Sequence, residues 1–169
     1  LFATLSILDI GLSTTLSRQL ARLSVIPDSE REQRDLVRTL EIVYWLPALA
    51  TGIIILIAAP YIARYWLNSQ ELSPETITTA VSLMGLVFVF RFPFALYQGR
   101  LFGLQRHVLV NAIIIVTGFM RSLGVLGILL WISPTIEAFF SWQFFISLIQ
   151  MILARASLWM TLPKYSVAP

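Results

Sequence analysis

Long apolar segments separated by short polar ones dominate the pattern of the chain. A helix that crosses the hydrocarbon core of a membrane needs about 20 mostly apolar residues. Five segments meet this requirement, and they cover about residues 1–20, 42–63, 76–101, 108–133 and 136–159. The ten-residue alternation typical of barrel strands does not occur. The pattern therefore predicts an all-α, polytopic transmembrane helical bundle that forms one domain over residues 1–169.

The composition supports this prediction and removes several other classes. Of the 169 residues, 57% are hydrophobic and only 12% are charged, about half the charged share of a soluble domain. High apolar content and a net charge of +3 also argue against disorder. The chain has no cysteine and one histidine, His107, and it contains no motif of known catalytic chemistry. We expect no enzyme, cofactor, metal site or nucleic-acid partner.

Positive charge is concentrated on one side of the predicted spans. Residues 18–38 carry five arginines, the turn 100–106 carries two, and Lys164 lies in the tail after the fifth span. The connections 68–75 and 133–137 contain neither lysine nor arginine. Loops rich in lysine and arginine stay in the cytoplasm. We therefore expect residues 18–38, the turn 100–106 and the tail with Lys164 on the cytoplasmic side, and the connections 68–75 and 133–137 on the outside.

Residues 29–38 mix acidic and basic side chains at helical spacing. They predict a separate surface helix before the second span. This helix would either contact anionic lipid head groups or serve as a solvated connection, and nearly balanced charges favour the solvated connection.

Three charged residues stand out because they lie deep inside the predicted spans, away from the ends: Asp9, Arg91 and Arg121. A charge at this depth is costly unless it faces the interior of the bundle or water, so each one indicates a functional site. At 1.5 Å per residue, Asp9 and Arg91 lie about 14 and 15 Å from the cytoplasmic end, which allows them to pair. Such a pair would either fix helix register or couple transport to protons through Asp9. Arg121 lies closer to the outer half.

Other polar residues extend a stripe around these charges at three- and four-residue spacing. The predicted lining residues of a shared cavity are Arg91, Gln98, Asn111, Arg121, Gln143 and Gln150. The three charges inside the spans sum to +1, so we expect a hydrated cavity that favours an anion. Two other interpretations stay open: the serine and glutamine stripes could hold helices together by hydrogen bonds, and Arg155 could extend to the membrane interface.

Two stretches resemble a known family. The first is residues 8–13, Leu-Asp-Ile-Gly-Leu-Ser, followed by Leu16, Arg18 and residues 21–22. The second runs from Pro93 through residues 96–106, Leu-Tyr-Gln-Gly-Arg-Leu-Phe-Gly-Leu-Gln-Arg, to Asn111. Together they resemble the second helix and the end of the fourth helix of bacterial polysaccharide-biosynthesis flippases. These flippases belong to the multidrug/oligosaccharidyl-lipid/polysaccharide exporter superfamily.

The resemblance implies that the chain is a fragment, helices two to six of the N-terminal lobe of a two-lobe transporter. It implies a multi-pass protein of the bacterial inner membrane that moves undecaprenyl pyrophosphate-linked oligosaccharide for surface polysaccharide biosynthesis. Arg91 and Arg121 would meet the diphosphate or acidic sugars in a cationic cavity. Membrane lipids and polysaccharide assembly proteins are the expected partners.

Three alternatives remain on the sequence alone. The chain could belong to an ion-coupled drug exporter or peptidoglycan-precursor exporter of the same superfamily, although a carrier of organic cations should show acidic residues in its cavity. It could be a membrane-embedded glycosyltransferase or polymerase, which the short outer loops disfavour. It could also be a structural membrane subunit in which every polar stripe serves packing.

Overall fold

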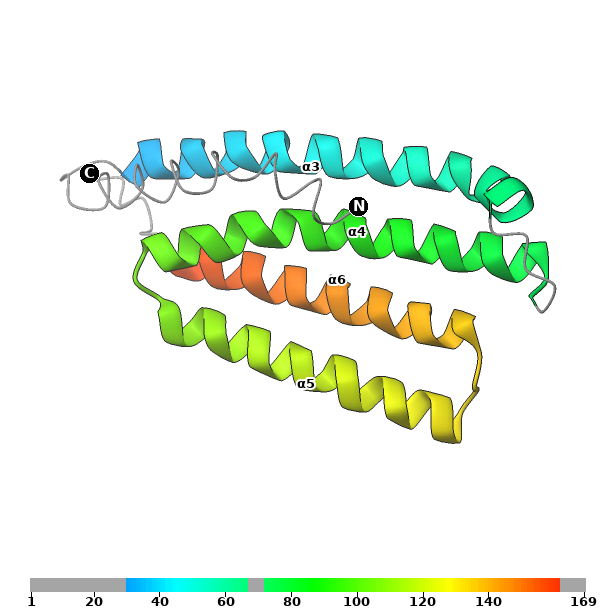
Figure 1. The fold of residues 1–169 in the computed structure, drawn as a ribbon. Coiled ribbons are helices and arrows are strands. Elements are labelled where there is room, and N and C mark those ends of the chain that lie inside the picture. Colours follow the sequence, from blue (N-terminus) through cyan, green and yellow to red (C-terminus); the bar gives the residue numbers. More distant parts are fainter. Residues whose placement is uncertain (1–29, 67–71, 162–169) are drawn as a thin grey trace.

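The computed structural model describes residues 30–66 and 72–161, and the regular secondary structure in this part of the chain is all helical (Figure 1). Its elements are α3 (Glu30–Tyr61), the short π-helix η1 (Ile62–Trp66), α4 (Pro74–Gly103), α5 (His107–Trp131) and α6 (Ile136–Thr161). Four helices are long and apolar enough to cross a membrane. They correspond to the second to fifth predicted spans, whereas the predicted span 1–20 lies outside the described residues.

Residues 30–38 are helical, as the sequence predicts, but they do not form a separate surface helix. Helix α3 runs without a break from Glu30 to Tyr61 and includes this segment as its first turns. No glycine or proline occurs before Pro47 to end it. A single buried face, with Val37, Leu40 and Tyr44, also continues across the predicted junction at three- and four-residue spacing. Packing of that face against α4 and α6 therefore carries one helix from the polar segment into the apolar one.

The four long helices do not pack in the order of the sequence. Helix α4 lies between α3 and α6, and α6 lies between α4 and α5, so α4 and α5 touch each other over a small area only (Figure 1). At the predicted cytoplasmic end, one core cluster joins all four helices. Its buried members are Val37, Tyr97, Leu101, Val110, Met151, Ala154 and Leu158. Helix α6 is therefore the central element against which both α4 and α5 pack.

Glycine allows α3 and α4 to approach closely in the half farther from that cluster. A Cβ atom added to Gly85 of α4 would lie 2.8 Å from Cγ2 of Ile55, and one added to Gly52 of α3 would collide with Cγ2 of Val89. A small residue on each helix removes this obstacle and lets the backbones come together. In this half the two helices are therefore held by close packing of backbone and aliphatic groups.

Arg100 lies inside α4 rather than in the cytoplasmic turn to which its sequence position assigned it. The last turns of α4 close with hydrogen bonds from Arg106 N–H to the Leu101 carbonyl (2.9 Å) and from Gln105 N–H to the Phe102 carbonyl (3.0 Å). Gln105 adopts a left-handed φ of 56°, as this type of helix end requires. The turn is therefore shorter than predicted, and the Arg100 side chain is only 1% exposed.

Candidate functional site

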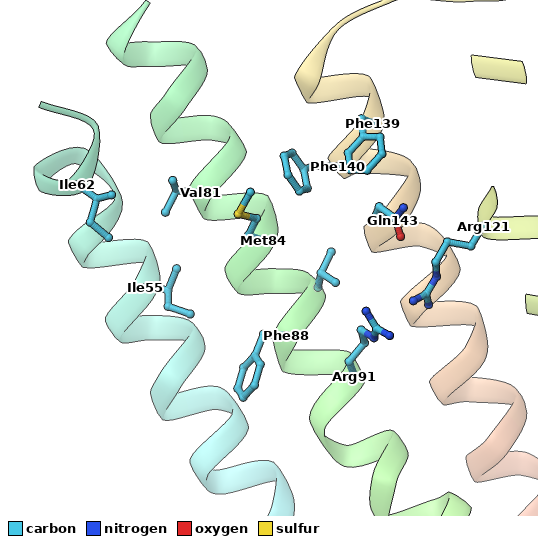
Figure 2. A pocket seen from close by; sticks show the side chains of 11 residues that line it. Ile55, Ile62, Val81, Met84, Phe88, Arg91, Arg121, Phe139, Phe140 and Gln143 are labelled. Carbon is cyan, nitrogen blue, oxygen red and sulfur yellow. The ribbon is translucent and has the colours of Figure 1, made fainter. Parts of the chain in front are cut away.

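A cavity of about 580 Å³ lies among the helices in the half predicted to face outward. Its walls come from the second half of α3, the first half of α4 and the start of α6, and α5 contributes Arg121 (Figure 2). The lining residues are Ile55, Ile62, Val81, Met84, Val87, Phe88, Arg91, Arg121, Phe139, Phe140 and Gln143. Two cations and one amide thus share a cavity whose other walls are aliphatic or aromatic.

The polar lining residues gather at one end of this cavity. Arg91 extends from α4 and Arg121 from α5, and Gln143 of α6 lies between them and the aromatic wall (Figure 2). Each arginine lies near the middle of a helix that is long enough to span a membrane. The structure therefore brings together three of the six predicted cavity residues, from three different helices.

Contacts with α6 hold Arg121 in place. Its Nη2 donates to Oε1 of Gln150 at 2.9 Å and to Oγ of Ser147 at 3.4 Å. The Ser147 hydroxyl in turn donates to the backbone carbonyl of Gln143 at 2.7 Å. The Nε of Arg121 is buried and has no hydrogen-bond partner among the described residues. The bonds to α6 therefore orient Arg121. Because a guanidinium carries five N–H donors, Arg121 still has donors to offer a ligand.

The predicted polar stripe of α6 faces inward. Ser147, Gln150, Ala154 and Ser157 are all buried, as their three- and four-residue spacing predicts. From Ser147 toward the C-terminal end of α6, however, this stripe serves helix packing instead of lining the cavity. Among the described residues, the lining is therefore mostly apolar with one polar end, whereas the polar stripes predicted a more hydrated cavity.

Asn111 and Gln98 lie away from the cavity. Asn111 is exposed near the start of α5, because the buried face of this helix follows Val110, Ile113 and Thr117, and one residue rotates a side chain by about 100°. Gln98 is half-buried on α4, about 10 Å along the helix axis from Arg91 at 1.5 Å per residue. Asp9 lies outside the described residues, so its pairing with Arg91 stays a prediction.

A second polar cluster, which the sequence analysis missed, joins α3, α4 and α6 near the predicted cytoplasmic end. Oε1 of Glu41 accepts hydrogen bonds from the Tyr97 hydroxyl (3.0 Å), Arg155 Nε (3.1 Å) and Trp159 Nε1 (3.2 Å). Trp45 Nε1 donates to the Tyr97 hydroxyl at 3.4 Å. We call Glu41, Trp45, Tyr97, Arg155 and Trp159 the Glu41 cluster.

The sequence held a signal for the Glu41 cluster. Glu41 directly precedes the second predicted span, and Arg155 lies near the end of the fifth, so both should approach the same membrane surface. Arg155 is 53% exposed and also forms the ion pair with Glu41. Its predicted extension to the interface and its role in holding α6 against α3 are therefore compatible.

Comparison with known proteins adds no identification. No family model, curated protein or solved structure matches the chain. In the part of the chain that the structure describes, no group of three or more His, Cys, Asp or Glu side chains could hold a metal ion. The chemistry of the site therefore follows from the cavity itself, in which two guanidinium groups and an amide face a space with apolar walls.

Proposed function

We propose that the chain is part of a flippase that moves undecaprenyl pyrophosphate-linked oligosaccharide across the bacterial inner membrane. In this proposal its five predicted spans are helices two to six of the N-terminal lobe of a two-lobe exporter. One observation carries the proposal. Arg91 and Arg121, from different helices, face the same cavity near the middle of their helices, and the described residues that line it include no carboxylate.

The electrostatics of this arrangement favour an anionic ligand. Placing two guanidinium groups beside one apolar cavity is costly, and a bound anion would offset that cost. Guanidinium groups are planar donors that bind phosphate oxygens through paired hydrogen bonds. A diphosphate presents several such oxygens to two arginines at once.

The apolar walls favour a ligand with an aliphatic part. Phe88, Phe139 and Phe140, together with aliphatic neighbours, form most of the lining. A volume of about 580 Å³ lies in the ordinary range for small-molecule sites. Isoprenoid units next to a diphosphate combine the two chemistries that the cavity offers. A carrier of organic cations would instead need acidic groups in this lining.

Transport itself would use movement of one lobe against the other. In exporters built from repeated bundles, rocking exposes a site near the middle of the membrane to each side in turn. The position of Arg91 and Arg121 near the middle of α4 and α5 suits such a site. The lipid-linked sugars would then cross beside protein and water instead of hydrocarbon.

Binding by the protein in lipid nanodiscs tests the proposal. We expect undecaprenyl pyrophosphate to bind more tightly than the neutral alcohol undecaprenol. Arg91→Gln and Arg121→Gln should each weaken binding of the diphosphate at least tenfold, since a hydrogen bond to a charged group contributes about 1.5–3 kcal/mol. Arg106→Gln provides the control, because Arg106 is exposed in the turn between α4 and α5.

Two outcomes would contradict the proposal. Equal affinity for the diphosphate and the alcohol, unchanged in both cavity variants, would assign the arginines to packing and favour a structural subunit. Uptake of an organic cation such as ethidium by proteoliposomes, without movement of a fluorescent lipid-linked oligosaccharide, would favour a drug exporter.

A further inference from the structure

Arg100 is the most unusual charged residue in the described part of the chain. Its side chain is 1% exposed, and its Nε, Nη1 and Nη2 are all buried without a hydrogen-bond partner among the described residues. A buried guanidinium with no hydrogen bonds is one of the most costly arrangements in a folded protein. Such a residue indicates a second arrangement of the surrounding helices in which the charge is paired.

The Glu41 cluster contains a suitable partner. Glu41 and Tyr97 lie within electrostatic range of Arg100, and Arg100 follows Tyr97 by three residues, which places both on one side of α4. Tyr97 already donates to Oε1 of Glu41 at 3.0 Å. The carboxylate is thus held next to the helix turn that carries Arg100.

The bond that holds Glu41 to Arg155 leaves room for exchange. Oε2 of Glu41 receives only a long contact of 3.5 Å from Arg155 Nη2, although each carboxylate oxygen can accept two hydrogen bonds. Arg155 is 53% exposed, whereas Glu41 is 12% exposed. If it leaves Glu41, Arg155 can extend to the membrane interface, an option that the buried Arg100 does not have.

We infer that Glu41 is shared between Arg155 and Arg100 and forms a two-position latch at the predicted cytoplasmic end. In the arrangement described here, Glu41 joins α3 to α6 through Arg155. In the other, Glu41 pairs with Arg100 on α4, and Arg155 turns outward. Because Tyr97 holds the carboxylate on α4 in both positions, the exchange removes the Arg155 link and loosens the end of α6, which keeps its bond from Trp159 to Glu41, while α3 and α4 stay together.

The latch rests on these contacts alone and does not depend on the ligand of the outer cavity. Its consequence is mechanical: a guanidinium pairs fully with a carboxylate by bonding to both of its oxygens, so a full pair with one arginine weakens the hold of the other. Any event that favours one pair shifts the population of the two arrangements by the difference in their stability.

A double-mutant cycle tests this competition. The coupling of Glu41 and Arg100 is obtained from unfolding equilibria of the protein in mixed micelles, using Glu41→Gln, Arg100→Gln and the double variant. We expect weak coupling while Arg155 is present. When Arg155→Gln is also present, the coupling between Glu41 and Arg100 should increase. The increase should correspond to about a tenfold factor in the unfolding equilibrium constant, as expected for a charged hydrogen-bonded pair. Arg106→Gln in place of Arg100→Gln should show no coupling in either background.

The release of α6 provides a second, independent measurement. The chain has no native cysteine, so spin labels at Thr39→Cys on α3 and Met160→Cys on α6 report one distance, and both positions are exposed. We expect Arg155→Gln to enrich a longer distance in nanodiscs. Arg100→Gln alone should deplete the longer distance about tenfold relative to the unsubstituted protein, because Glu41 then has only Arg155 to pair with.

Several results would overturn the latch. Coupling between Glu41 and Arg100 that is the same with and without Arg155 would show that the two arginines do not compete. An effect of Arg100→Gln that persists in the Glu41→Gln background would show that Arg100 acts through a different anion. If Arg100→Gln fails to insert, an unchanged label distance in Arg155→Gln alone would be sufficient to reject the proposal.

Discussion

The two halves of the bundle use arginine in opposite ways. In the half predicted to face outward, Arg91 and Arg121 line a cavity that has no carboxylate among its lining residues in the described part of the chain. At the predicted cytoplasmic end, Arg155 and the buried Arg100 flank a single carboxylate, Glu41. The difference teaches that Arg155 joins α6 to α3 through an acid, whereas Arg91 and Arg121 face a cavity whose described lining offers them none.

The halves also differ in how α3 is held against α4. At the predicted cytoplasmic end the link is polar, from the Tyr97 hydroxyl to Glu41 at 3.0 Å. In the outer half it is steric, because Gly52 and Gly85 let the two backbones approach closely. A polar link can exchange partners, whereas close packing resists rearrangement. Movement of these helices should therefore begin at the cytoplasmic end.

Loss of the carboxylate should have the largest effect on stability. Glu41→Leu removes the acceptor of Tyr97, Arg155 and Trp159 and leaves all three donors unpaired. We expect the free energy of unfolding to fall by about 3 kcal/mol, measured by denaturation in mixed micelles. Glu137→Gln is the control, since Glu137 is exposed in the first turn of α6. Equal losses in both variants would remove the distinction between the two halves.

A methyl group at the glycine contact should have an intermediate effect. Gly85→Ala would bring Cβ to 2.8 Å from Cγ2 of Ile55, and overpacking of this kind costs about 1–3 kcal/mol. Gly118→Ala is the matched control, because a Cβ there meets nothing within 4 Å. Thermal unfolding in nanodiscs measures both. A stable Gly85→Ala protein would mean that α3 and α4 are not fixed by close packing in the outer half.

Removal of a cavity arginine should have the smallest effect on the fold. Arg121→Gln loses the bond to Gln150 (2.9 Å), but it also removes a buried Nε that has no partner among the described residues. These effects oppose each other, so we expect the free energy of unfolding to change by less than about 1 kcal/mol. A loss as large as that of Glu41→Leu would show that Arg121 holds helices together as the Glu41 cluster does.

Much of the fold follows from hydrophobic pattern and length. Four predicted spans match described helices to within a few residues, apart from the polar first turns of α3, because a run of apolar residues without charges has few other stable arrangements in a membrane. The surface segment was misjudged since a change in polarity does not end a helix. No glycine or proline occurs between Glu30 and Leu46, and α3 continues even through Pro47.

The candidate site could be predicted only in part. Spacing along α6 correctly placed Ser147 and Gln150 on an inward face. Spacing along α5 placed Asn111 with Arg121, although the buried face of α5 turns Asn111 outward. Periodicity shows which residues share a side of one helix, but it does not show which side a neighbouring helix covers.

By itself, the sequence determined the helical class, the positions of the spans and the presence of charges at membrane depth, because each depends on local hydrophobicity. The tertiary structure alone decided which charges meet. Helix α6 lies between α4 and α5, and this arrangement directs Arg121 to α6, brings Arg91 to the same cavity and places Glu41 beside Arg155. Contacts between helices depend on the order in which they pack, and hydrophobic pattern leaves that order open.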